Sequence, residues 1–259
     1  MLPRNFVRLC LLAALAAGCS APRVELEPQF VPLDLDGRLA ATSGGTTTAV
    51  SLDDLNLDND GVEAGGRVDL KWGSPHLSAS YAPGSFSGDG KLTAPFTFGG
   101  TTIAAGTPVS SDFRFNVASG ALTFDLLPVP DVELGIGLGV AVVDFRGRIA
   151  DPSTGTTIAT SSTIPVPLLA GRFTWEIWRL EAALLVSGFD YSINGDSMAY
   201  YDVDAQLRFR FLGDDGHLQG YVGLGYRQVG ADFAYDDGGT RVRSDATLKG
   251  PFLGLVLGF

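Results

Sequence analysis

The stretch Leu248-Lys249-Gly250-Pro251-Phe252-Leu253-Gly254-Leu255-Val256-Leu257-Gly258-Phe259 decides the fold. Large apolar side chains occupy every second position of its second half, at Leu253, Leu255, Leu257 and Phe259. A period of two indicates a β-strand whose two faces meet different environments. The stretch therefore predicts a strand that ends on an aromatic residue and carries one strongly apolar face.

The same alternation recurs upstream and predicts an all-β chain of ten strands, with eight as the alternative count. The expected strands are 33–42, 62–72, 76–92, 111–127, 132–148, 164–178, 180–193, 201–211, 217–233 and 248–259. We expect a bend with a β-bulge at Pro83-Gly84. Phe113, Phe115 and Val117 have the opposite parity to the later apolar residues of that strand, so a second bulge near Ser119-Gly120 is expected to keep one face apolar.

The connections between these strands are of two kinds, short after every second strand and mostly longer and polar after the others. That pattern is typical of a transmembrane barrel with short periplasmic turns. Beyond the first twenty residues no segment has the 18 unbroken apolar residues of a transmembrane helix. A closed β-barrel is the other structure that satisfies all backbone hydrogen bonds in a bilayer. The expected fold is an antiparallel up-and-down transmembrane β-barrel. An even strand count places both of its ends in the periplasm.

The amino-terminal segment has the pattern of an export signal. Arg4 and Arg8 precede a short apolar run, and Leu15-Ala16-Ala17-Gly18-Cys19 resembles a lipobox. We expect a signal peptide over 1–18, a lipidated tether over 19–32 anchored at Cys19, and a barrel over 33–259. An unlipidated secretory signal is the alternative. The formal net charge of −11 argues against a nucleic-acid partner.

Opposite charges alternate with the apolar residues and are expected to pair inside a narrow or plugged lumen, because buried charges must be paired or hydrated. This predicted charge ladder comprises Glu63, Arg67, Asp69, Lys71, Arg172, Glu176, Glu181, Asp202, Asp204, Arg208 and Arg210. Alternation alone leaves open which face points outward. A lipid-anchored soluble barrel of lipocalin type, binding a small apolar ligand, is the rival interpretation, although strand one lacks that family's Gly-x-Trp.

Aromatic and histidine positions add two expectations. All three tryptophans, Trp72, Trp175 and Trp178, fall at short-turn ends, where a periplasmic aromatic belt is expected. His76 and His217 fall at the same ends. Outer-membrane proteases, deacylases and palmitoyltransferases place a histidine at the outer rim or in the membrane-facing site, so we expect no enzyme here.

The first long connection imitates half of a calcium-binding loop. Asn56, Asp58, Asp60 and Gly61 match its early positions, but the twelfth position is Arg67 and not glutamate. A solvated acidic loop is the expected state, with Asn56, Asp58 and Asp60 as a weak cation site. No cofactor is expected.

In its strand pattern and terminal Phe259 the chain resembles the small outer-membrane β-barrel superfamily that includes OmpA-type and OmpW-type proteins. The resemblance implies insertion into outer-membrane lipid of a Gram-negative envelope. It also implies recognition of Phe259 by the barrel-assembly machinery and a monomeric barrel. The expected function is structural or adhesive, or the passage of small solutes.

Overall fold

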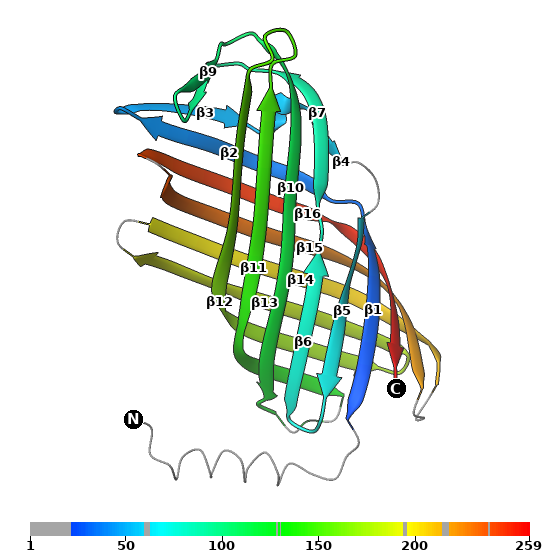
Figure 1. Cartoon of the computed structure of the whole chain (residues 1–259). Helices are drawn as coiled ribbons and strands as arrows, with labels where there is room; N and C mark the ends of the chain where they lie inside the picture. Colours follow the sequence, from blue (N-terminus) through cyan, green and yellow to red (C-terminus); the bar gives the residue numbers. More distant parts are fainter. Residues whose placement is uncertain are drawn as a thin grey trace.

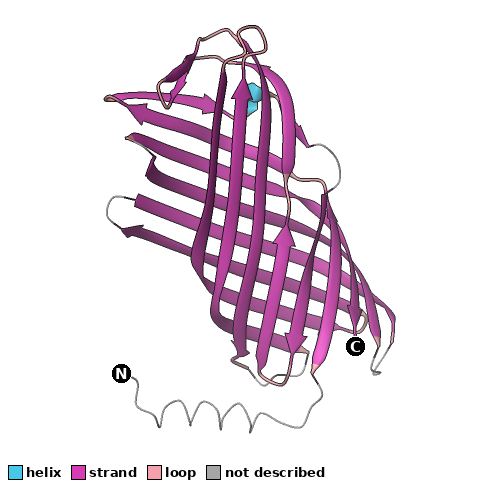
Figure 2. Cartoon of the chain, in the orientation of Figure 1, coloured by secondary structure: helices cyan, strands magenta, loops and turns pink. Residues whose placement is uncertain are grey.

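The structure, a computed structural model, describes residues 22–59, 63–127, 129, 131–193, 196–213, 218–237 and 239–259. Figure 2 shows that strands make up nearly all of this part of the chain, with one short 3-10 helix, η1 (Asp53–Leu55). Among the described residues, no helix is long and apolar enough to cross a membrane. The signal peptide, Cys19 and His217 lie outside the described residues.

Fourteen strands form one antiparallel sheet that closes on itself (Figure 1). Its strands are β1 (Arg23–Val31), β2 (Asp34–Ser43), β3 (Thr46–Ser51), β4 (Leu57–Asn59), β5 (Glu63–Lys71), β6 (Pro75–Ala82), β7 (Ser85–Lys91), β10 (Pro108–Asp125), β11 (Val132–Ala150), β12 (Thr157–Ile177), β13 (Leu180–Ile193), β14 (Asp196–Leu212), β15 (Gln219–Asp237) and β16 (Thr240–Gly258). A separate hairpin joins β8 (Phe96–Phe98) to β9 (Thr101–Ile103).

Ten positions make up the barrel wall. β1 and β2 lie end to end and together occupy one strand position, and β6 and β7 together occupy a second. β5 and each of the strands β10 to β16 occupy one position each. Neighbours in sequence are neighbours in the wall, which is the up-and-down topology. The predicted count of ten is confirmed, and the alternative of eight is not.

The barrel is closed by β16, which pairs with β1 along its second half and with β2 along its first half. Residues 23–31 are therefore part of the wall, and the prediction of a tether over 19–32 is wrong for them. Leu26 and Phe30 point outward while Glu27 and Gln29 are buried inside, so the segment alternates as a strand does. Pro28 and the mixed charges hid that period in the sequence.

The barrel has two ends, which we name by what they hold. The terminal end carries Arg23, Phe259 and the connections after β5, β10, β12 and β14, whereas the loop end carries the others. The loop-end connections after β13 and β15 are short, because β14 begins at Asp196 and β16 at Thr240. The polar residues expected in long loops there belong instead to the strands β13 to β16, which extend obliquely to the left in Figure 1.

The two faces of the sheet exchange character partway along the barrel. In the terminal half apolar side chains face outward, with Leu138 67% and Leu224 66% exposed, and charged side chains face the lumen. In the loop half the apolar side chains face inward, and Phe115 and Phe145 are buried. The expectation that one face stays apolar throughout is therefore wrong.

Neither predicted bulge is present. β10 pairs with β11 without a register shift through Ser119 and Gly120, so the change in apolar parity there marks the level at which the two faces exchange. At Pro83-Gly84 the strand is interrupted, but Ala82 faces Val117 and Ser85 faces Arg114 with no residue inserted. The strand is therefore interrupted at this point, and the predicted bulge is absent. The register shifts instead between Arg210 and Leu212, where β14 meets β15.

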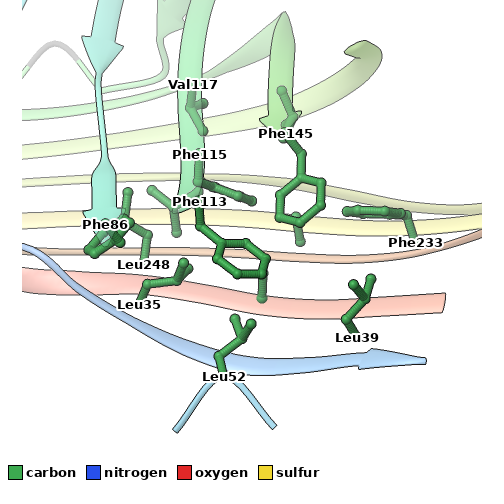
Figure 3. Packing of buried hydrophobic residues seen from close by; sticks show 14 of the residues in the cluster. Leu35, Leu39, Leu52, Phe86, Phe113, Phe115, Val117, Phe145, Phe233 and Leu248 are labelled. Carbon is green, nitrogen blue, oxygen red and sulfur yellow. The ribbon is translucent and has the colours of Figure 1, made fainter. Parts of the chain in front are cut away.

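The loop half is built as two facing sheets. β12 pairs with β13 only over Leu169–Ile177, so above Leu169 the two strands diverge (Figure 1). β7, β10, β11 and β12 then form one layer, and β13 to β16 with β2 and β3 form the other. Aromatic rings pack between the layers, with 5.8 Å between the centroids of Phe145 and Phe233 and 6.0 Å between those of Phe113 and Phe145 (Figure 3).

The first long connection closes part of this core and is not a wholly solvated acidic loop. Leu52 and Leu55 are buried in the core, and the Leu52 amide donates to the carbonyl of Gly37 at 3.0 Å. β4 pairs with β7 over Leu57–Asn59. The apolar residues of the connection hold it against the barrel, while Asn56 and Asp58 remain exposed.

Candidate functional site

The lumen of the terminal half holds the densest chemistry of the described chain, and Glu27 lies at its centre. Glu27 Oε2 is 2.6 Å from Arg67 Nη2 and 2.7 Å from Arg208 Nη2. Gln29 donates to Glu27 Oε1 at 2.9 Å. Glu27 and Arg67 lie on the neighbouring strands β1 and β5, whereas Arg208 lies on β14, which neighbours neither. A carboxylate with 1% exposure therefore joins β14 to the opposite part of the wall.

Further ion pairs extend this cluster around the lumen. Arg67 also contacts Asp69 at 3.1 Å and Asp204 at 3.2 Å. Arg208 contacts Glu181 at 2.8 Å. A neighbouring pair on β14 and β15 joins Asp202 to Arg227, with 2.7 Å between Oδ2 and Nη2. Charge compensation with several hydrogen bonds per carboxylate is what a buried ionic network requires.

A second cluster lies nearer the terminal end. Arg172 forms ion pairs with both Asp125 and Glu133, and Lys71 forms one with Glu133. The buried His76 places Nε2 3.1 Å from Asp125 Oδ2. Ligand atoms of His76, Asp125 and Glu133 lie within 4.8 Å of one another, which is the geometry of a metal-ligand group. Arg172 and Lys71 already balance the two carboxylates, so a divalent cation would have to displace them, and we assign no metal.

Two cavities accompany these clusters. A hollow of about 280 Å³ opens at the terminal end and is lined by side chains of both signs, including Arg23, Lys71, Glu133 and Glu176. A smaller space of about 50 Å³ lies against the Glu27 cluster and is lined by Ser78, Ser119 and Asp202 among others. The ion pairs connect strands across the lumen. The hollow at the terminal end is large enough for small polar molecules.

Most of the predicted charge ladder lies in this network. Ion pairs within the lumen include ten of its members: Arg67, Asp69, Lys71, Arg172, Glu176, Glu181, Asp202, Asp204, Arg208 and Arg210. Glu63 is the exception, because no ion pair within the described residues includes it. It lies opposite Val31 at the start of β5, toward the loop end.

Sequence reasoning missed the residue at the centre. Glu27 and Gln29 fell in the segment taken for a tether, and the signal that would have found them is the alternation of Leu26 and Phe30 with polar neighbours. Asp125, Glu133 and Arg227 were also outside the predicted ladder, although each lies on the inward face of its strand.

The structure places the other predicted residues as follows. Trp72, Trp175 and Trp178 all lie at the terminal end, with Trp175 46% and Trp178 75% exposed. The Phe259 ring is 51% exposed, and its amide and carbonyl both pair with Val24. Among the described His, Cys, Asp and Glu residues, the grouping with metal-ligand geometry is His76, Asp125 and Glu133 and does not include Asp58. Asn56 and Asp58 are exposed, and Asp60 lies outside the described residues.

Comparison with known proteins places the fold. No protein-family model and no curated protein matches the chain. Among solved structures, the outer membrane protease OmpT from Escherichia coli has a TM-score of 0.53 at 11% identity, covering 94% of this chain and 100% of that one. Ail of Yersinia pestis gives 0.36 at 8% identity over 93% and 100%. The Pseudomonas putida toluene transporter TodX gives 0.32 at 10% identity over 95% and 92%. The likeness to OmpT shows the fold, an antiparallel transmembrane β-barrel of the outer-membrane kind.

Proposed function

We propose that this chain is a non-enzymatic outer-membrane β-barrel with a sealed lumen, which presents its loop half outside the cell as a structural or adhesive surface. The observation that carries the proposal is the position of Glu27, whose carboxylate binds Arg67 on the neighbouring strand and Arg208 across the interior. Breaking a buried ion pair by removing one partner costs several kcal/mol, so such a network does not open readily.

The core of the loop half supports a second seal. Phe113, Phe115, Phe145 and Phe233 pack between the two layers above the charged network, and Leu52 and Leu55 add to that core from the first long connection. A polar solute entering from the loop end would have to displace close-packed apolar side chains. Small barrels with side-chain-filled interiors leave no aqueous channel.

The proposed orientation puts the terminal end in the periplasm. Short turns and interfacial tryptophans at that end support it. A lipid on Cys19 would then lie on the same side as Arg23, where the described chain enters β1. The exposed Phe259 would be accessible to the barrel-assembly machinery before closure. We propose a monomer in outer-membrane lipid.

The lipocalin-type alternative accounts for only half of the molecule. Its inward apolar face matches the loop half, but a soluble barrel would leave Leu138 and Leu224 exposed to water in the terminal half. Contiguous apolar surface of that kind marks contact with another apolar phase. Passage of small solutes is the second candidate function, favoured by the polar hollow of about 280 Å³ at the terminal end.

Planar-bilayer recording tests the sealed lumen. The full-length protein, refolded in detergent and checked by heat-dependent gel mobility, should insert without stable conductance steps, while a general porin treated in the same way should conduct. Steady single-channel steps would contradict the seal and favour solute passage. A Cys19→Ser variant that stays soluble without detergent would refute membrane insertion.

A further inference from the structure

A basic hollow lies on the outward face of the loop half. It has a volume of about 810 Å³, spans β7, β10, β11 and β12, and is lined by Arg114, Arg146 and Arg148 together with Ser85 and Ser161. All three arginines are exposed, and the side chain of Arg146 is 60% exposed. Asp112 is the acidic residue of the lining.

Arg148 lies opposite Asp112, but Arg114 and Arg146 face each other, and that arrangement is unfavourable without a counter-charge. Arg114 lies directly opposite Arg146 in the pairing of β10 with β11, and like charges at such positions repel. Ser85 and Ser161 continue the same row on either side. Arg146 has one weak ion pair, at 3.5 Å to Asp144, and no ion pair among the described residues includes Arg114 or Arg148. Two facing guanidinium groups with hydroxyls beside them match the donor set for a phosphate.

The hollow lies just above the outward apolar band. On β11 the last large apolar side chain facing outward is Val142, and Arg146 follows four residues later with the same parity. With a rise of about 3.3 Å per residue and the usual tilt of barrel strands, that separation is a height of about 10 Å. Lipid headgroups occupy roughly 5–8 Å beyond the hydrocarbon, and arginine side chains reach back toward that zone.

The wall formed by β16 and β2 differs in how its charges pair. On β16 and β2 the outward side chains mix both signs, and Arg243 and Arg38 alternate there with Asp245 and Asp36. Lys249 forms an ion pair with Asp36. Arg38 lies directly opposite Asp245 there, whereas Arg114 lies opposite Arg146 on β10 and β11. The facing of two like charges is therefore a feature of β10 and β11, not of both walls.

We propose that Arg114 and Arg146, assisted by Arg148, Ser85 and Ser161, bind the phosphate groups of phosphorylated lipid headgroups in the surrounding outer leaflet. The site rests on the proposed membrane orientation, which brings these arginines to headgroup height. Phosphate oxygens would accept hydrogen bonds from both guanidinium groups and remove the repulsion between β10 and β11. Free phosphate offers the same chemistry, and the two sources are separated by experiment.

The test uses full-length protein refolded in detergent. Native mass spectrometry would measure binding of bis-phosphorylated lipid A, of the same lipid stripped of its phosphates, and of inorganic phosphate. The test variant is Arg114→Ser with Arg146→Ser. The matched control is Arg38→Ser with Arg243→Ser, which removes two exposed arginines from β2 and β16. Heat-dependent gel mobility confirms that each variant is folded.

We expect the test variant to bind the phosphorylated lipid at least about tenfold more weakly than the wild type, and the control to stay within about twofold. The dephosphorylated lipid should bind at the weak level in all proteins. Equal binding by wild type and test variant, or equal binding of both lipids, would overturn the site. Binding of inorganic phosphate without the lipid would overturn the headgroup as its source. A wild type without heat-dependent mobility would refute the barrel itself.

Discussion

Glu27 on β1 and Arg208 on β14 are separated by 181 residues of sequence, and their side chains meet at 2.7 Å inside the barrel. The carboxylate is 1% exposed and also binds Arg67. Two buried cations therefore share one anion, and Glu27 links the ion pairs of Arg67 with Asp69 and Asp204 to that of Arg208 with Glu181.

Glu27→Ala should lower the free energy of unfolding by about 3 kcal/mol, because two buried guanidinium groups lose their shared partner and keep only their other carboxylates. Urea unfolding in detergent micelles would measure it. The control is Glu176→Ala, since Glu176 is 33% exposed where it pairs with Arg210 and should cost at most about 1 kcal/mol. Equal effects of the two substitutions would contradict the central role of Glu27.

Leu224→Arg and Asp232→Arg test the exchange of faces on one strand. Both residues point outward from β15, but Leu224 is in the apolar band and Asp232 is exposed in the loop half. Arginine at the midplane of a bilayer costs about 2–4 kcal/mol. The second change should shift stability by about 0.5 kcal/mol or less. Refolding yields and unfolding in lipid vesicles report both, and a barrel that tolerates Leu224→Arg is not in a membrane at that level.

Phe259→Ser should reduce the amount of assembled barrel in cells several-fold while changing the stability of the assembled fraction by about 1 kcal/mol. The ring is 51% exposed, and the backbone pairing with Val24 survives the substitution. Leu255→Ser is the control, because Leu255 lies on the same outward face of β16 at 39% exposure. Heat-dependent gel mobility of outer-membrane fractions measures assembly. An equal deficit in both variants would assign the effect to lost apolar surface.

Asp151, in the turn between β11 and β12, should make that hairpin sensitive to acid. Hydrogen bonds from the Ser153 and Thr154 hydroxyls, at 2.6 and 2.8 Å, lower the pKa of its carboxyl to about 2. Because the pKa of the folded state lies below the ordinary 3.8, the stabilisation is present above about pH 4 and is lost as the pH falls through 2.

Hydrogen exchange of the β11–β12 turn between pH 5 and about pH 2 would show that loss. Asp151→Asn should flatten the dependence on pH in the turn while leaving β15 and β16 as they are. An unchanged profile in Asp151→Asn would assign the acid response to another group.

The terminal half of the barrel could be predicted from the sequence because lipid and lumen impose opposite demands on alternate residues. Leu138 and Leu224 face outward as their parity predicts, and Arg67, Asp204 and Arg208 face inward. The tethering interpretation of 23–31 failed because Pro28 and four charged or amide side chains mask a short strand. Tertiary pairing with β5 and β16, which a local pattern does not report, holds that segment in the wall.

The loop half was harder to predict. Alternation with a period of two shows that the two faces of a strand differ, but it does not show which face points inward. Phe113 and Phe124 have opposite parity on β10, and the simplest explanation from sequence was a bulge. The structure keeps the register and changes the environment, so Phe113 is buried between two layers and Phe124 is 50% exposed. The basic row of Arg114 and Arg146 follows from the same exchange, and only the pairing register brings the two side chains together.

The pairing of Val24 with Phe259, one hydrogen bond in each direction, joins the first described strand to the last residue of the chain. Closing a contact between segments so far apart in sequence carries a large loop-closure entropy and is slow. Until β16 is in place, β1 is paired with β5 on one side only, and its other edge stays available to other chains. The pairing of β1 with β16 is therefore expected to form last. A chaperone that covers the unpaired strand edges would raise the yield of folded barrel more than a substitution that stabilises the folded state.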